Sequence, residues 1–104
     1  MSYATALTAL DDPMRRRILD ELRAGPLPVG ALADRLPVSR PAISKHLRVL
    51  EAAALVRHEP RGTRRVYELD GRGALGLRDW LSAWWDEPLT RFAAHVEEDG
   101  HADD

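Results

Sequence analysis

The sequence comprises 104 residues, of which 44% are hydrophobic and 31% are charged, with a formal net charge of -2 and no cysteine. This length and composition predict one soluble globular domain over residues 1–104, and the missing cysteines exclude disulfides and thiolate chemistry. No apolar stretch approaches the ~20 residues of a membrane span, and the N-terminus does not resemble a signal peptide, so we expect a cytoplasmic protein without membrane contact.

Apolar spacing predicts two helices at the start of the chain. Tyr3, Leu7 and Leu10 fall at i, i+4 and i+7, which indicates a short first helix with one apolar stripe. Asp12 can cap a second helix, and Pro13 can take its first position. The apolar face of this second helix consists of Met14, Ile18, Leu19 and Leu22.

Residues 29–54 have the pattern of two helices joined by a short turn. A brief helix is predicted over about residues 30–36, and Pro37 ends it. Ser39 is a good N-cap for the following helix, and Pro41 is tolerated in its first turn. The apolar positions of this helix repeat at i, i+4 and i+7, and they are Ile43, Leu47 and Leu50. This arrangement is typical of a helix-turn-helix unit, whose second helix enters the major groove of DNA.

The spacing changes after this second helix. Residues 55–59 and 64–69 have strand character, and Pro60-Arg61-Gly62-Thr63 separates them. Together they predict a β-hairpin with Gly62 in its turn, which we call the wing (residues 55–69). The predicted fold is therefore mostly helical with a small β element: a winged helix-turn-helix of about five helices and a two-stranded antiparallel hairpin.

A long last helix is predicted over about residues 73–98, after a turn at 70–73. Pro88 interrupts it and removes one backbone donor. We therefore expect either a kink at Pro88 or a new helix that begins there, with Asp86 or Glu87 near its cap.

The two ends of the chain carry more apolar surface than a small winged helix can cover. Trp80 and Trp84 are expected to pack partly within the protomer, whereas the adjacent Trp85 points elsewhere. A symmetric homodimer would bury the remainder and would match a palindrome whose half-sites are ~34 Å apart. The expected interface residues are Tyr3, Leu7, Leu10, Trp85, Leu89, Phe92 and Val96.

The charge is distributed unevenly along the chain. From Arg15 to Arg65 there are twelve Arg or Lys against five acids, whereas residues 66–104 hold three basic residues and ten acids. Phosphate is attracted by local positive charge, so the middle of the chain can bind DNA if the acidic end lies away from it. The three arginines at positions 15–17 are either a solvated helix surface or phosphate contacts.

The second helix of the unit and the wing supply candidate contacts to double-stranded DNA. Arg40, Ser44 and Lys45 are expected to read base edges, while Ser39 and the helix N-terminus can bind a phosphate. The arginines at 48, 61, 64 and 65 are better placed for phosphate or the minor groove. The full candidate set is Ser39, Arg40, Pro41, Ser44, Lys45, His46, Arg48, Arg61, Thr63, Arg64 and Arg65. The alternative interpretation is an ordinary amphipathic helix with a solvated outer face.

Several segments together resemble bacterial ArsR-type (ArsR/SmtB) winged-helix repressors. These are Leu36–Glu51 (LPVSRPAISKHLRVLE), Leu55-Val56, Gly62–Leu69 (GTRRVYEL) and Leu10–Leu19 (LDDPMRRRIL). The resemblance implies a homodimer whose first and last helices form the interface, and which represses transcription by binding an operator. Family members usually have glycine at the position of Ala54, because a left-handed C-cap is easiest for glycine. Either Ala54 accepts a strain of about 1 kcal/mol or the helix ends differently.

Many proteins of this type sense metals through cysteine pairs, or through Asp and His on the last helix. The first kind of site is excluded here, and Asp86, His95 and Glu98 make a weak set of ligands because no second histidine is in register. We therefore expect no metal and no cofactor, and the existence of a small-molecule effector stays open. His46 is expected to face DNA and His58 to lie in a strand.

Two other classes of function are alternatives to DNA binding. A winged-helix module could bind other proteins through its apolar C-terminal face and have little or no affinity for DNA. An enzyme is not expected, because no serine has a recognisable base and no phosphate-binding glycine loop is present.

Overall fold

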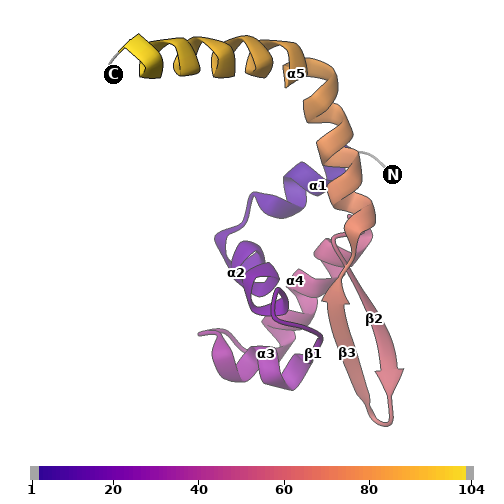
Figure 1. Ribbon diagram of the computed structural model, residues 1–104. Helices are drawn as coiled ribbons and strands as arrows, with labels where there is room; N and C mark the ends of the chain where they lie inside the picture. The colour runs from indigo at the N-terminus through magenta and orange to yellow at the C-terminus, as the bar shows by residue number, and fades with distance from the viewer. Residues whose placement is uncertain (1–2, 103–104) are drawn as a thin grey trace.

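The computed structural model describes residues 3–102, with side chains described as far as residue 97 (Figure 1). Its elements are α1 (Tyr3–Leu10), α2 (Pro13–Leu22), β1 (Leu27–Pro28), α3 (Val29–Arg35), α4 (Arg40–Ala52), β2 (Val56–Arg61), β3 (Arg64–Leu69) and α5 (Gly71–Ala102). Five helices and a β-wing in this range confirm the predicted winged helix-turn-helix fold. None of these helices is both long and apolar enough to cross a membrane.

The first two helices are joined by side chains that cap them. Asp12 caps α2 as expected, since its carboxylate accepts the backbone N–H of Arg15 at 3.2 Å. The Arg15 guanidinium donates to the carbonyl of Ala9 at 2.6 Å, and the Arg16 guanidinium donates to the carbonyl of Leu10 at 2.6 Å. These carbonyls belong to the last turn of α1, where they lack partners within the helix. Arg15 and Arg16 thus hold α1 against α2, a role that neither alternative from the sequence included.

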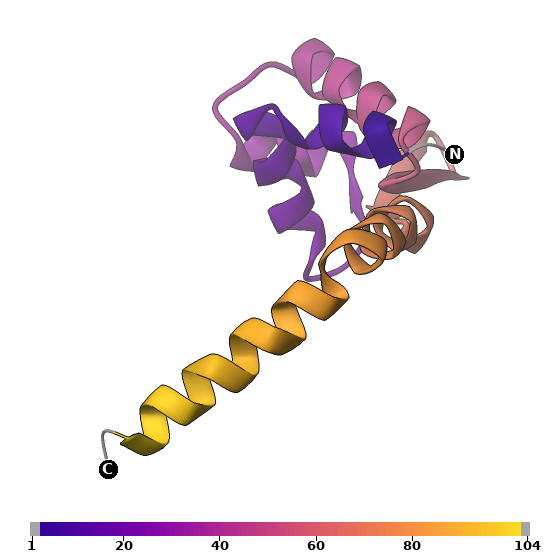
Figure 2. The same ribbon diagram turned by 90° about the horizontal axis from the view of Figure 1, so that it is seen from above.

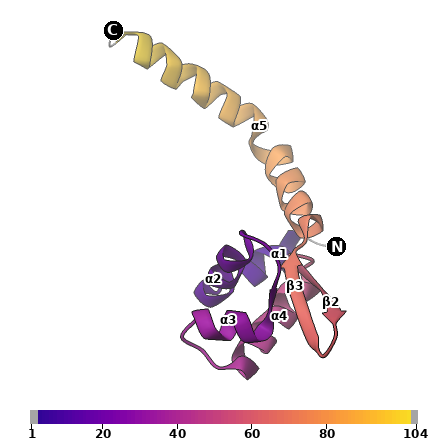
Figure 3. The same ribbon diagram turned by 60° about the horizontal axis from the view of Figure 1, so that its bottom comes forward.

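α4 forms the centre of the hydrophobic core. Its predicted stripe of Ile43, Leu47 and Leu50 is completely buried, and each such side chain contributes about 1.5–3 kcal/mol of stabilisation. The same core cluster includes Ile18 and Leu22 of α2, Leu32 of α3, Val56 of β2 and Tyr67 of β3. Figure 3 shows α2 on one side of the α3 and α4 pair and the wing on the other, so the core fixes the wing beside the helix-turn-helix.

The wing is a tight hairpin that carries a third strand. β2 and β3 pair from Val56↔Leu69 to Arg61↔Arg64, and a two-residue turn joins them with Gly62 at φ +63°. The turn is therefore shorter than the loop expected at 60–63, because Pro60 and Arg61 belong to β2. Proline is tolerated there because β2 is an edge strand of the sheet. β1 pairs with the other side of β3, so the strand order is β1-β3-β2. β1 cannot be predicted from the sequence, since two residues show no periodicity.

α4 ends in a left-handed cap at Ala54. Ala54 has a φ of +53°, and its N–H donates to the carbonyl of Glu51 at 2.9 Å. The N–H of Leu55 donates to the carbonyl of Leu50 at 3.0 Å, which completes a Schellman motif. The first of the two alternatives is therefore correct, and Ala54 accepts a conformation that costs about 1 kcal/mol.

α5 begins two residues earlier than expected because Asp70 caps it. The buried carboxylate of Asp70 accepts two kinds of hydrogen bond from Arg72, one from its backbone N–H at 3.0 Å and one from its guanidinium at 2.7 Å. The turn expected at 70–73 is therefore wrong for residues 71–73, which belong to α5. The N–H of Gly73 donates to the carbonyl of Ala54 at 2.9 Å, so the first turn of α5 rests directly on the cap of α4.

The Asp70 carboxylate should make stability depend on pH in the acid range. The hydrogen bonds from the Arg72 guanidinium, followed by the one from its backbone N–H, lower the pKa of Asp70 below its usual value of 3.8. Because the folded-state pKa is the lower one, this stabilisation is fully present above pH 3.8 and is lost as the pH falls through the folded-state value.

We therefore expect Asp70→Asn to lower the free energy of unfolding at neutral pH. Its difference from the wild type should shrink as the pH falls below about 4, where the carboxyl of the unfolded chain becomes protonated, and should vanish below the lower folded-state pKa. Urea unfolding at a series of pH values measures the difference. A difference that stays constant into strong acid would contradict the role assigned to Asp70.

α5 leaves the body of the molecule as an arm (Figure 2). The radius of gyration is 18.1 Å, compared with about 13 Å for a compact domain of 100 residues. α5 is one continuous helix that bends in its middle part, as Figure 1 shows. Pro88 lacks a backbone N–H and its ring crowds the carbonyl of Trp84, while the Thr90 hydroxyl donates to the carbonyl of Asp86 at 2.8 Å. The kink is thus the correct alternative, and no separate helix begins at Pro88.

Candidate nucleic-acid interface

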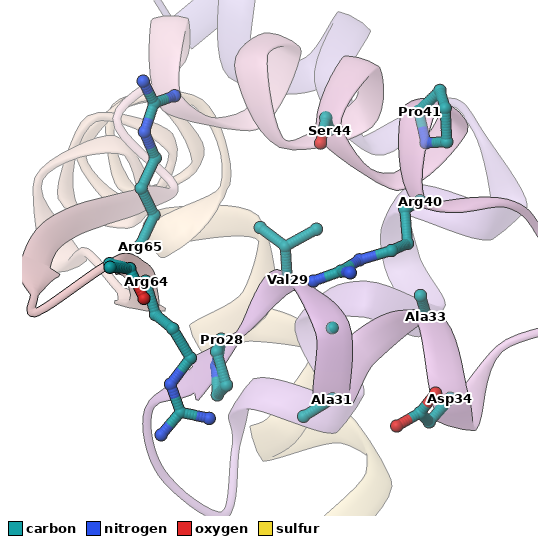
Figure 4. Close-up of a pocket in the computed structure, with 12 residues that line it drawn as sticks. Pro28, Val29, Ala31, Ala33, Asp34, Arg40, Pro41, Ser44, Arg64 and Arg65 are labelled. Atoms are coloured by element: carbon teal, nitrogen blue, oxygen red, sulfur yellow. The ribbon is translucent and has the colours of Figure 1, made fainter.

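A cleft of about 830 Å³ opens between α3, the beginning of α4 and the wing (Figure 4). It is lined by Pro28, Val29, Gly30, Ala31, Ala33, Asp34, Arg40, Pro41, Ser44, Thr63, Arg64 and Arg65. Three arginines against one acid make its wall positively charged, and we call it the basic cleft. The fold brings six of the predicted DNA-binding residues together here, namely Arg40, Pro41, Ser44, Thr63, Arg64 and Arg65.

The helix-turn-helix places Arg40 and Ser44 on the wall of the basic cleft. Ser39 caps α4 as predicted, since its hydroxyl oxygen accepts the N–H of Ala42 at 3.3 Å. Arg40 follows at once and extends into the cleft, and within the described residues it forms no hydrogen bond or ion pair. Ser44 is one turn further along on the same side of the helix. A free guanidinium and a hydroxyl at this spacing can donate to base edges in the major groove.

The arginines of the wing differ in how far their charge is already neutralised. Arg61 is held by Glu59 at 2.7 Å, so it is a weaker phosphate ligand than the sequence alone suggested. Arg64 and Arg65 have no ion-pair partner within the described residues, and Figure 4 shows them extending in different directions from β3. Consecutive strand residues point to opposite faces, so the pair presents positive charge on both sides of the wing.

Four predicted residues of α4 lie outside the basic cleft. Lys45 and Arg48 are exposed on the neighbouring face of the helix, beyond the cleft that Arg40 and Ser44 line. The hydroxyl oxygen of Ser39 accepts the capping bond, which leaves its O–H able to donate to a phosphate. His46 is half-buried, and it adds a small electrostatic contribution to the lowered pKa of Asp12, whose main cause is the hydrogen bond from the backbone N–H of Arg15. Because His46 is less exposed than Lys45, it is a poorer candidate for a DNA contact.

His58 connects the wing to the C-terminal end of α4. It lies in β2 as expected, its Nδ1 is hydrogen-bonded to the Glu51 carboxylate of α4, and its ring lies 5.1 Å from that of Tyr67. These contacts join β2 to α4, and neither His58 nor Glu51 lines the basic cleft.

This chain is similar to several known transcriptional regulators. Residues 10–59 match the family model described as "Helix-turn-helix domain". The HTH-type transcriptional regulator Rv2034 of Mycobacterium tuberculosis is 50% identical over 95 residues, which cover 91% of this chain and 89% of that protein. The solved ArsR-like transcriptional regulator from Rhodococcus sp. RHA1 is 36% identical with a TM-score of 0.74, covering 91% of this chain and 90% of that chain. The chain belongs to the ArsR family of winged helix-turn-helix transcriptional regulators.

A second curated relative comes from a different bacterium and is named a repressor. The transcriptional repressor SdpR of Bacillus subtilis is 37% identical over 73 residues, which cover 70% of this chain and 81% of that protein. As an ArsR-family regulator, this protein is a DNA-binding transcriptional regulator and not an enzyme. Its recognition unit consists of α3 and α4.

The arm of this ArsR-family regulator exposes the apolar stripe predicted for a dimer. Phe92 is 65% exposed and Trp85 is 50% exposed, and Leu89 and Val96 continue the stripe. Within α1, Leu7 and Tyr3 are also exposed, although the Tyr3 ring stacks on Trp80 with 4.8 Å between centroids. Leu10 differs, since it is partly buried against the protomer's own core.

Trp84 does not pack within the protomer as expected. It is 67% exposed, whereas Trp80 is half-buried against Tyr3. The reason is the path of α5, which carries everything beyond its first turns away from the body (Figure 2).

Asp86 and His95, two of the three weak candidate metal ligands, form no metal-binding cluster with other described side chains. Among the side chains that the structure describes, no three His, Asp or Glu residues lie close enough together to hold a metal ion. Asp86 and His95 both lie in α5, and the side chain of Glu98 lies outside the described residues.

Proposed function

We propose that this regulator is a homodimeric repressor that binds a palindromic operator through α4 and the wing. The observation that carries the proposal is the basic cleft, which is lined both by Arg40 and Ser44 of α4 and by the unpaired Arg64 and Arg65 of β3. Base edges are read from a helix in the major groove, and phosphates are bound by flanking cations. The similar protein SdpR is named a transcriptional repressor, which supports repression as the mode of action.

The exposed arm supports a dimer. A stripe that includes Trp85, Leu89, Phe92 and Val96 would leave a large apolar surface in water if the protein were a monomer. A second copy related by a twofold axis would cover it and would place two recognition helices about 34 Å apart, which is one turn of DNA. The stripe on α1 lies beside the first turns of α5 and would extend the same interface.

The charge distribution supports this docking direction. The wing tip and the far end of α5 lie at opposite ends of the molecule in Figure 1. The acidic residues of α5 are therefore remote from the phosphates that the basic cleft would meet, so the net charge of -2 does not oppose binding. We infer a cytoplasmic location from this target.

Two substitutions separate base recognition from phosphate binding. Arg40→Ala should cost about 1–3 kcal/mol on the operator and little on unrelated duplexes, because a guanidinium contact to a base edge is lost. Arg64→Ala should weaken binding to all duplexes and reduce the slope of log K against log salt by about 1. Affinity measurements by fluorescence anisotropy at several salt concentrations distinguish the two effects.

Arg23→Ala is the matched control. Arg23 is the exposed C-cap residue that follows α2, paired with Asp20 at 3.8 Å and outside the basic cleft, so its removal should leave both affinity and salt slope unchanged. Binding that does not depend on salt, or a wild-type protein that binds no promoter duplex, would refute the proposed function and favour a protein-interaction module.

A further inference from the structure

Gly30 lies in the first turn of α3, against the side chain of Arg40. A β-carbon placed on Gly30 would lie 2.8 Å from the guanidinium Nη2 of Arg40 and 3.4 Å from its Cζ. The shorter of these separations is below any normal carbon contact, so the guanidinium occupies the space that a side chain at position 30 would need. The two residues come from different helices of the recognition unit, and only the fold brings them together.

Nothing else in the described structure requires glycine at this position. Gly30 is not among the residues with positive φ, so its backbone conformation is open to any amino acid. Glycine within a helix is otherwise destabilising relative to alanine. The space taken by Arg40 is thus the feature that favours glycine here.

The contact directs Arg40 without consuming its donors. The guanidinium crosses from α4 over the backbone of α3 and ends beside Val29 in the basic cleft, as Figure 4 shows. It has no hydrogen bond or ion pair within the described residues, and Asp34 on the same wall does not pair with it. All of its N–H groups stay available to a ligand in the cleft.

We propose that Gly30 is a specificity-determining position of the DNA interface, where it acts as a positioning residue for Arg40. This inference rests on the proposed function. A guanidinium that already lies in one direction loses less conformational freedom when it meets a base edge. A side chain at position 30 would displace Arg40 from the surface of α3, and the same arginine would then approach the DNA from another direction.

The test is a double-mutant cycle on the duplex that the wild-type protein selects from a random-sequence pool. Wild type, Gly30→Ala, Arg40→Ala and the double variant are compared on this duplex and on a scrambled one. We expect Gly30→Ala to weaken binding to the selected duplex by about three- to tenfold, and to the scrambled duplex by less than about twofold. Thermal stability should not fall, because the displaced atoms are the end of a flexible side chain and alanine favours a helix.

The background variants show whether the effect passes through Arg40. Gly30→Ala should have no further effect in an Arg40→Ala background and should keep its full effect in a Lys45→Ala background. A new selection with Gly30→Ala should also change the preferred base at one position of each half-site.

Effects of Gly30→Ala and Arg40→Ala that simply add would overturn the inference, as would unchanged base preference. A wild type that selects no duplex at all contradicts the proposed function itself, so the two failures are distinguishable.

Discussion

Gly73→Ala is expected to destabilise the fold by about 3 kcal/mol, because α5 meets the end of α4 without room for a side chain at this position. A β-carbon on Gly73 would lie 2.4 Å from the carbonyl oxygen of Ala53 and 2.9 Å from that of Ala54. Both atoms belong to the backbone of a Schellman motif, so the clash cannot be relieved by a side-chain rotation. Chemical denaturation followed by circular dichroism measures the loss.

Gly76→Ala is the matched control in the same helix. A β-carbon on Gly76 has no atom within 4 Å, so this variant should gain about 0.5–1 kcal/mol from helix propensity alone. If Gly73→Ala were as stable as Gly76→Ala, the direct seating of α5 on the Ala54 cap would be wrong.

Phe92→Asp is expected to produce a monomer and to lower operator affinity by about 100-fold or more. A carboxylate at the centre of the apolar stripe would lose its hydration in a dimer interface without gaining a partner. A monomer engages one half-site at a time, so the gain from joining two recognition helices disappears. Sedimentation equilibrium and anisotropy with a full palindrome measure the two effects.

Ala94→Asp adds the same charge to the opposite side of α5, two residues further along the helix. It should remain dimeric and bind the operator with wild-type affinity. A Phe92→Asp protein that is still a dimer would contradict the placement of the interface on this stripe. A monomeric variant with undiminished operator affinity would contradict the need for two joined half-sites.

The local signals in the sequence were sufficient for the elements of the recognition unit. Asp12 and Ser39 cap their helices as predicted, and the stripe of Ile43, Leu47 and Leu50 is the buried face of α4. Caps and helical periodicity depend on residues three or four positions apart, so they can be read from the chain itself. For the end of α4 the sequence left two alternatives, a left-handed Ala54 or a different helix end. The energetic cost of a left-handed alanine has to be offset by tertiary contacts, and these cannot be read from the sequence.

Other predictions failed where distant residues decide. Arg15 and Arg16 bind the carbonyls of α1, a role that neither alternative for positions 15–17 included, although Arg16 and Arg17 remain exposed to solvent. β1 forms only because β3 offers it an edge. Trp84 is exposed because α5 departs from the body, which no periodicity within α5 indicates.

The sequence by itself determined a winged helix-turn-helix fold with a basic middle, an acidic end and a recognition helix that begins after Ser39, since each of these follows from composition or from short-range spacing. Only the tertiary structure decided which cations share one surface. Arg40 and Arg64 come from different elements and line one cleft, and the Arg40 side chain lies against Gly30, because the core of α4 and the pairing of β3 hold these elements together. Such contacts require packing between separate elements. That packing is set by the complete core and cannot be read from any local segment.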